Sequence, residues 1–225
     1  MSDGRGIEET HRGYAVRRET WQLGGYRFDL TWPVDVDSLL DLPEVQERFA
    51  RDEYMPYWAQ PWPASVLLTE AVLAGEEGRG RAAVELGCGV GLVSLAAAMK
   101  GWSVVASDYD EDAIAFAELN AARNRVRLAG TTRVDFRLPL DEPAYERVFG
   151  ADLTYERRNA EPLARWLASA LVAGGEAWLS DPNRSAGDSF PAHAEAVGLR
   201  VEVEAVETTA PVGLFHRGRI WRVYR

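Results

Sequence analysis

The sequence predicts an α/β fold in which a mostly parallel sheet carries helices on both faces. The first observation is an apolar strand, Ala82–Leu86, that enters a glycine-dense turn and is followed by the amphipathic stretch Leu92–Met99. The second is that strand-like and helix-like patterns alternate from Ala82 onward, which requires right-handed crossovers and a parallel core. The third is length, because 225 residues suffice for one such domain with a modest extension but not for two full domains.

Composition narrows the class of protein. Hydrophobic residues make up 47% of the chain, enough for a sizeable core, and the formal net charge of -10 argues against a nucleic-acid-binding face and suits a basic substrate better. The single cysteine, Cys88, excludes an internal disulfide and a cysteine-cluster metal site, and we expect no metal. Met1–Arg5 lacks an apolar signal region and no stretch is long enough to span a bilayer, so we expect a cytoplasmic protein with no membrane partner.

A hairpin is expected near the N-terminus. Tyr26–Trp32 alternates apolar and polar side chains, the pattern of a half-buried strand, and a glycine pair would join it to Tyr14–Trp21. The polar residues up to Gly13 are expected to fray. Asp35–Arg51 has apolar side chains at roughly helical spacing and is either a short helix or a lid.

A stiff aromatic segment, Pro56–Pro63, comes next and holds Trp58 and Trp62 among its prolines. Behind it, Ala64–Leu73 has the pattern of an amphipathic helix. An aromatic wall beside a glycine turn can hold a cation by cation–π attraction. The alternative is that these side chains only cap the sheet.

The glycine-dense turn has an acid on its strand and three alternating glycines: Glu85, Gly87, Gly89 and Gly91. It is not the dinucleotide-binding pattern, because Leu92 stands where that pattern is completed. Free backbone N–H groups and a helix N-terminus at the carboxyl edge of a parallel sheet favour an anionic or carboxylate-bearing ligand. The alternative is a tight turn without a ligand.

A second buried strand, Ser103–Ser107, ends in an acidic turn. Asp108 lies about 20 residues past the glycine turn, where an acid accepts hydrogen bonds from ribose hydroxyls in related folds. Tyr109 can flank an adenine ring. Asp110 is expected to cap the helix Glu111–Asn124.

The next strand is expected at Arg133–Phe136. Asp135 at its end can accept a hydrogen bond from an adenine amino group while Phe136 packs on the ring, although strand ends often carry such residues without a role.

The remaining predicted elements after the fourth strand are a helix over Pro162–Ala173 closed by Gly174-Gly175, a strand over Glu176–Ser180, a helix over Phe190–Val197, and strands over Arg200–Glu207 and Ile220–Tyr224.

The fourth strand, Val148–Leu153, ends in Asp152-Leu153-Thr154-Tyr155, which holds an acid and a tyrosine three residues apart. Residues just past the carboxyl end of a central strand face the crevice where a substrate binds. The alternative is that Asp152 caps the following turn and Tyr155 only packs.

Four separated stretches resemble one family, the class I S-adenosylmethionine-dependent methyltransferases. Within it, the chain resembles the seven-strand protein lysine methyltransferases of family 16, most of all the group that contains the electron-transfer-flavoprotein β-subunit lysine methyltransferases and their bacterial relatives. The stretches are Pro56-Tyr57-Trp58-Ala59 with Trp62-Pro63, the glycine turn, Asp152-x-x-Tyr155, and Asp181-Pro182-x-Arg184.

The resemblance covers about Tyr54–Arg225 and leaves the first fifty residues unaccounted for. Asn183 departs from it where glycine is expected, and Phe136 stands where many relatives carry tryptophan. Amino-methylating nucleic-acid enzymes carry an Asp/Asn-Pro-Pro-aromatic turn after the fourth strand, and the Leu153-Thr154 pair departs from that turn, which disfavours a base as substrate.

The resemblance implies a Rossmann-like, doubly wound seven-strand sheet in the order 3-2-1-4-5-7-6 with strand seven antiparallel. Residues 1–53 would form an N-terminal extension, a hairpin plus helix over the cofactor end, and residues 54–225 the class I methyltransferase domain. We expect a monomer.

The implied activity is transfer of a methyl group from S-adenosyl-L-methionine to a lysine ε-amine on a partner protein. The runner-up substrate is a small-molecule amine, as in nicotinamide-N-methylase-like proteins, and a third reading is an idle cofactor-binding module. The implied catalytic residues are Asp152 and Tyr155, and the implied cofactor-binding residues are Trp58, Trp62, Glu85, Gly87, Gly89, Gly91, Asp108, Tyr109, Asp135 and Phe136.

Overall fold

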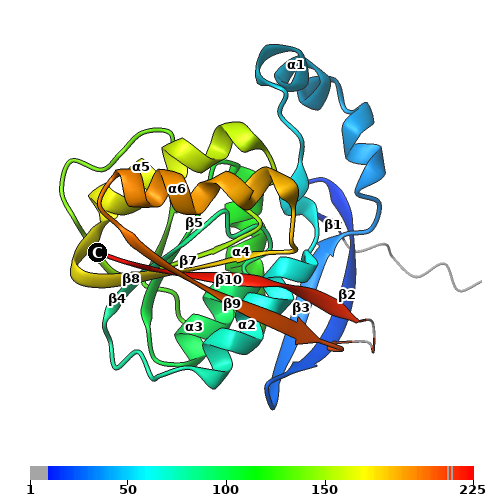
Figure 1. The fold of residues 1–225 in the computed structure, drawn as a ribbon. Coiled ribbons are helices and arrows are strands. Elements are labelled where there is room, and N and C mark those ends of the chain that lie inside the picture. The colour runs from blue at the N-terminus through cyan, green and yellow to red at the C-terminus, as the bar shows by residue number, and fades with distance from the viewer. Residues whose placement is uncertain (1–9, 212, 214) are drawn as a thin grey trace, which may run out of the picture.

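The computed structural model describes residues 10–211, 213 and 215–225 and contains two sheets (Figure 1). The larger has seven strands in the order β6-β5-β4-β7-β8-β10-β9, and β10 runs antiparallel to both of its neighbours. This confirms the predicted order. The strands are β4 (Ala82–Leu86), β5 (Ser103–Asp108), β6 (Gly130–Arg133), β7 (Tyr145–Ala151), β8 (Leu171–Asp181), β9 (Arg200–Thr208) and β10 (His216–Tyr224).

Helices cover both faces of this sheet because its central strands are apolar on both sides (Figure 1). One face carries α2, α3 and α4, whose apolar side chains join the first core cluster, and the other carries α5 and α6, which join the second. The helices are α1 (Pro43–Asp52), α2 (Pro63–Ala74), α3 (Leu92–Met99), α4 (Glu111–Arg123), α5 (Ala160–Ala170) and α6 (Phe190–Ala196), with short 3-10 turns η1 (Asp37–Asp41), η2 (Tyr57–Ala59), η3 (Arg157–Asn159) and η4 (Ser185–Ser189).

The second sheet is the N-terminal hairpin. Strands β2 (Tyr14–Leu23) and β3 (Tyr26–Pro33) pair antiparallel, as predicted, and β1 (Thr10–His11) adds a short third strand. The prediction that the chain frays up to Gly13 is therefore wrong for residues 10–13, which form β1 and the turn after it. Residues 1–9 lie outside the described residues. Asp35–Arg51 resolves into η1 and α1.

Two asparagine side chains at the C-terminal end of α4 hydrogen-bond to the backbone of β3 and so hold this sheet against the helix layer. The Asn120 amide accepts from the backbone N–H of Thr31 at 2.8 Å and donates to its carbonyl at 3.0 Å. Asn124 makes the same pair of bonds to Asp29, at 2.8 and 2.9 Å. Two asparagines one helical turn apart therefore act as a partner strand for β3.

The third strand of the large sheet lies earlier than predicted. The prediction of Arg133–Phe136 is wrong, because β6 ends at Arg133 and the chain turns at Asp135. The Asp135 carboxylate accepts from the backbone N–H of Arg137 at 3.0 Å, and its carbonyl accepts from Leu138 at 3.0 Å. An aspartate that bonds its own following backbone favours a turn over a strand.

The predicted helix over Pro162–Ala173 also ends too late. α5 stops before the glycine pair and β8 starts at once, so Gly174 and Gly175 lie within a strand and do not cap a helix. The pairing of β7 with β8 shifts register between Tyr145 and Arg147. A Cβ on Gly175 would stand 3.2 Å from the Tyr145 carbonyl oxygen, so glycine permits the close approach at this irregularity.

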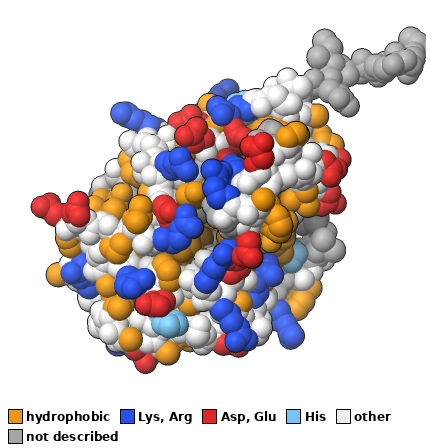
Figure 2. Space-filling view, turned by 90° about the horizontal axis from the view of Figure 1, so that it is seen from above, with side chains coloured by type: hydrophobic (Ala, Val, Ile, Leu, Met, Phe, Trp, Pro, Cys, Tyr) orange, Lys and Arg blue, Asp and Glu red, His pale blue; other side chains and the backbone are white. Residues whose placement is uncertain are grey.

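Within the described residues, no helix is both long enough and apolar enough to cross a membrane. The face of the molecule seen from above carries acidic and basic side chains interspersed with apolar ones (Figure 2). The net charge of -10 therefore does not show there as a single acidic field.

Candidate cofactor and acceptor site

A cavity of about 370 Å³ lies where the loops after β4, β5, β7 and β8 meet the aromatic segment. A second cavity, of about 270 Å³, adjoins it, and Tyr54, Gly87, Asp108 and Tyr109 line both. The first is lined by the predicted residues Trp58, Trp62, Glu85, Gly87, Gly89, Asp108, Tyr109, Asp152 and Tyr155. The second is lined by Asp135 and Phe136.

The glycine turn exposes its backbone to the first cavity. Gly87 and Gly89 have φ of 61° and 50°, a conformation that favours glycine. A Cβ on Gly89 would lie 3.2 Å from the carbonyl oxygen of Trp58, and one on Gly87 would lie 2.7 Å from the Leu153 side chain. A side chain at Gly89 would therefore crowd the aromatic segment, and one at Gly87 would crowd Leu153 on the loop after β7.

Gly91 has a different place. It is the N-cap of α3 with φ 86°, and it lies outside the lining of both cavities. A Cβ there would stand 2.9 Å from that of Ala117 on α4. Its geometry supports the packing of α3 against α4.

Glu85 lines the cavity but points its carboxylate into the protein. It accepts hydrogen bonds from the backbone N–H of Ser94, at 2.7 Å, and from the Ser94 hydroxyl. Ser94 is in the first turn of α3, so the carboxylate satisfies an N–H that has no partner within the helix. Burial raises the pKa of Glu85 to about 8.

Asp108 ties the second strand to the glycine turn. Its carboxylate accepts from the backbone N–H groups of Gly89, at 2.9 Å, and Asp110, at 3.0 Å. Burial raises its pKa to about 6, against the opposing effect of these N–H donors. Beside it, the Tyr109 ring lies under the guanidinium of Arg133, 4.8 Å from the ring centre.

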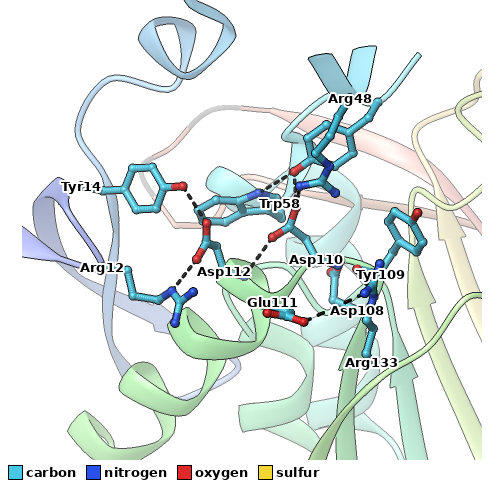
Figure 3. Close-up of polar contacts among 11 residues, drawn as sticks. Arg12, Tyr14, Arg48, Trp58, Asp108, Tyr109, Asp110, Glu111, Asp112 and Arg133 are labelled. Carbon is cyan, nitrogen blue, oxygen red and sulfur yellow. Dashed lines mark hydrogen bonds and ion pairs between the residues drawn. The ribbon is translucent and has the colours of Figure 1, made fainter. Parts of the chain in front are cut away.

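Asp110 connects the N-terminal extension to the site (Figure 3). One carboxylate oxygen caps α4 at Asp112, which confirms the predicted cap. The other accepts from Arg48 of α1, at 2.9 Å, and from the Tyr54 hydroxyl, which also accepts from the Trp58 indole. Arg12 and Tyr14 of the hairpin sheet bind Asp112 in turn. Asp110 therefore anchors α1, and Asp112 in the first turn of α4 anchors the hairpin sheet.

The aromatic wall of the first cavity contains a buried ring, Trp58, and two half-exposed rings, Tyr57 and Tyr155. Trp58 is 7% exposed and packs on Phe116 of α4, with ring centres 5.3 Å apart. Trp62 donates its indole N–H to the Tyr57 carbonyl at 2.6 Å. The Tyr57 and Tyr155 rings, 5.1 Å apart, are both about 40% exposed at the cavity.

In the second cavity, Asp135 forms a two-pronged ion pair with Arg137, whose guanidinium lowers the pKa of the carboxyl. Phe136 is partly buried against the second core cluster. Both therefore have structural partners as well as a place in the cavity wall.

Asp152 follows β7 with φ 55°. Its carboxylate meets the guanidinium of Arg184, which follows β8, in two hydrogen bonds of 2.8 Å each. Arg184 and Tyr54 also line the first cavity, although the sequence analysis predicted neither as a site residue. The Asp181-Pro182-x-Arg184 pattern was the available signal for Arg184. No signal in the sequence pointed to Tyr54.

A buried aspartate sets the position of Arg184. Asp181 is fully buried and accepts from the Arg184 backbone N–H at 2.8 Å, from the Arg219 guanidinium at 3.1 Å and from the Thr154 hydroxyl at 3.1 Å. Arg219 also donates to the Arg184 carbonyl at 2.9 Å. The loops after β7 and β8 are thus joined at both Asp181 and Asp152.

Comparison with known sequences gives one consistent result. A family model described as lysine methyltransferase matches residues 57–188. Similar proteins include the electron transfer flavoprotein beta subunit lysine methyltransferases of Danio rerio, 29% identical over 58% of this chain and 51% of the relative, and of Homo sapiens, 30% identical over 68% and 59%. The chain spans about half the length of the curated relatives it matches.

Solved structures agree on the fold. A protein studied in the conversion of a disulfide bond into a thioacetal group during echinomycin biosynthesis aligns with a TM-score of 0.59 and 20% identity, over 82% of this chain and 93% of that one. TYW2 of P. horikoshii, in complex with MeSAdo, aligns with a TM-score of 0.54 and 21% identity, over 73% and 64%. At these identities the likeness is one of fold.

Proposed function

This chain belongs to the lysine methyltransferase family, and from that membership and the geometry of its cavity we propose that it transfers a methyl group from S-adenosylmethionine to the ε-amine of a lysine on a partner protein. The observation that carries the proposal is that Asp152 and Tyr155 line the same cavity as the glycine turn and Asp108. A cofactor held by the turn would face these two side chains.

The residues present fit S-adenosylmethionine. Gly87 and Gly89 carry no side chain, which leaves room beside the turn for the methionine moiety of the cofactor. Asp108 lies at the strand end suited to ribose hydroxyls, and Asp135 and Phe136 line the adjoining cavity that suits adenine. When bound, S-adenosylmethionine supplies an electrophilic methyl group on a positively charged sulfur.

The acceptor amine must be neutral, because only the free lone pair can attack carbon. A lysine has a pKa of about 10.4 in water and is protonated at neutral pH. The exposed Tyr57 and Tyr155 rings remove water from an entering side chain, which favours the uncharged amine. Asp152 orients the amine by accepting a hydrogen bond from its N–H, and Tyr155 narrows the channel around it.

The relatives are named for the β subunit of electron transfer flavoprotein, so that protein is the first substrate to test. The enzyme is incubated with methyl-labelled S-adenosylmethionine and either the recombinant β subunit or a cell extract, and protein and small-molecule fractions are counted separately. We expect label in protein. Label confined to small molecules supports the amine alternative, and cofactor binding without any transfer supports the idle module.

A further inference from the structure

Every carboxylate that lines the first cavity already has a partner. Glu85 binds Ser94 and Asp108 binds backbone N–H groups. The other three pair with cations: Asp110 with Arg48, Glu156 with Arg158, and Asp152 with Arg184. A substrate ammonium entering this cavity therefore meets carboxylates that already have partners, three of them cations.

The Asp152–Arg184 pair is the one beside Tyr155 at the proposed acceptor end. The Asp152 side chain is 9% exposed and that of Arg184 is 42% exposed. The guanidinium uses Nε and Nη2 for the carboxylate, one to each oxygen. A carboxylate oxygen can accept more than one hydrogen bond, so Asp152 retains capacity for an amine N–H while it is paired.

An unpaired carboxylate at this position would oppose the reaction. A negative charge next to an amine favours its ammonium form, which has no lone pair to attack the methyl group. A carboxylate neutralised by a fixed guanidinium exerts much less of this effect and still accepts a hydrogen bond.

We propose that Arg184 is a positioning residue that neutralises Asp152, so that the carboxylate orients the substrate amine without holding it in its protonated, unreactive form. This inference rests on the proposed lysine methyl transfer. Arg184 acts through Asp152 and needs no contact with the cofactor.

Arg184 is the cation paired with Asp152, and the neighbouring cations Arg219 and Arg158 are paired with other carboxylates. At the end of β8, Asp181 is paired with Arg219 of β10, which also binds Asp188 of η4. On the loop after β7, Glu156 is paired with Arg158. The other titratable groups facing the pair are the phenols of Tyr57 and Tyr155, and burial raises the pKa of Tyr155, so it stays neutral near pH 7.

The test is the pH dependence of kcat, which reports ionisations in the enzyme–substrate complex. The wild type, Arg184→Met, Arg184→Lys and the double variant Asp152→Asn/Arg184→Met are compared, with saturating S-adenosylmethionine and the protein that takes up label in the experiment above. Arg165→Gln, which removes an exposed pair with Glu161 on α5, is the matched control. Cofactor affinity and thermal unfolding verify that each variant is folded.

We expect Arg184→Met to move the acid limb of the kcat profile up by about one pH unit, so that kcat is about tenfold lower on that limb and recovers at high pH. Arg184→Lys and the double variant should return the limb toward the wild-type position, because each restores neutrality, and Arg165→Gln should leave it unchanged.

An equal loss of kcat at every pH in Arg184→Met would overturn the inference and assign Arg184 a structural role only. A double variant shifted as far as Arg184→Met would also overturn it. A wild type that transfers no label to protein at any pH contradicts the proposed function itself, and the inference fails with it.

Discussion

The guanidinium of Arg184 meets the carboxylate of Asp152 in two parallel hydrogen bonds of 2.8 Å, although the residues are 32 positions apart in the chain. The pair joins the loops after β7 and β8 at the cavity, and Asp181 holds the backbone of Arg184 beneath it. An exposed ion pair contributes little to stability, whereas this one has two-pronged geometry and one nearly buried partner. Both residues line the first cavity together with Tyr155, which is the basis of the role proposed above for Arg184.

The first prediction concerns Asp108. Asp108→Ala should weaken S-adenosylmethionine binding by about 1.5–3 kcal/mol, or about ten- to 150-fold, because charge-assisted hydrogen bonds to ribose hydroxyls are lost. Isothermal titration calorimetry measures the affinity, with Asp141→Ala, an exposed acid outside both cavities, as the control. Equal affinities in wild type and Asp108→Ala would refute the ribose assignment, and preference of the wild type for NAD would refute the cofactor.

The second prediction concerns pH and Glu85. An unfolded glutamate loses its proton near pH 4.5, but burial raises the pKa of Glu85 to about 8 in the folded protein. Unfolding therefore releases a proton between these pH values, and rising pH favours the unfolded state. Relative to Glu85→Gln, the wild type should lose stability by up to about 1.4 kcal/mol per pH unit from pH 5 to pH 8.

Urea unfolding at each pH without added cofactor gives this difference, because other titrating groups contribute equally to both proteins. Parallel stability curves for wild type and Glu85→Gln across the window would show that Glu85 does not hold a proton in the folded state.

The third prediction separates two glycines with positive φ. Gly91→Ala places a Cβ 2.9 Å from Ala117, whereas Gly25→Ala, at a similar φ, meets nothing within 4 Å. Gly25→Ala should cost about 1 kcal/mol for its backbone conformation, and Gly91→Ala should cost about 1–3 kcal/mol more for overpacking. Denaturant midpoints measure both, and equal losses would mean that α3 and α4 adjust freely at Gly91.

The fourth prediction tests the anchor of the N-terminal extension. Tyr54→Phe removes a donor to the nearly buried carboxylate of Asp110 and should lower the free energy of unfolding by about 1.5–3 kcal/mol. Tyr224→Phe, which removes an exposed hydroxyl contact to Glu202, is the matched control and should cost less than about 0.5 kcal/mol. If the two variants lose the same stability in urea, the Asp110 network does not anchor α1.

The parallel core of the large sheet could be predicted because apolar strands and amphipathic helices alternate in the sequence, and the strand order followed from the family resemblance. Local turn chemistry caused the errors. Asp135 bends the chain by bonding its own following backbone, and the Gly174-Gly175 pair, which also suits a helix end, serves an irregular strand.

The place of a candidate site residue could be predicted where the residue ends a buried strand next to the glycine turn, as at Asp108, which lines both cavities. It could not be predicted where the arrangement depends on contacts between distant segments. Three contacts are of this kind: the Asp152–Arg184 ion pair, the hydrogen bond from the Tyr54 hydroxyl to Asp110, and the hydrogen bonds of the Asn120 amide to β3.

Asp152→Ala tests the proposed role of Asp152, which is to orient a lysine amine for methyl transfer. The variant should bind S-adenosylmethionine with near wild-type affinity by calorimetry, because Asp108 and the glycine turn are intact, and should methylate the protein substrate at least about 100-fold more slowly. Peptide mass mapping should place the residual methyl group on a lysine ε-nitrogen. Normal cofactor affinity together with near wild-type turnover in Asp152→Ala would contradict the account.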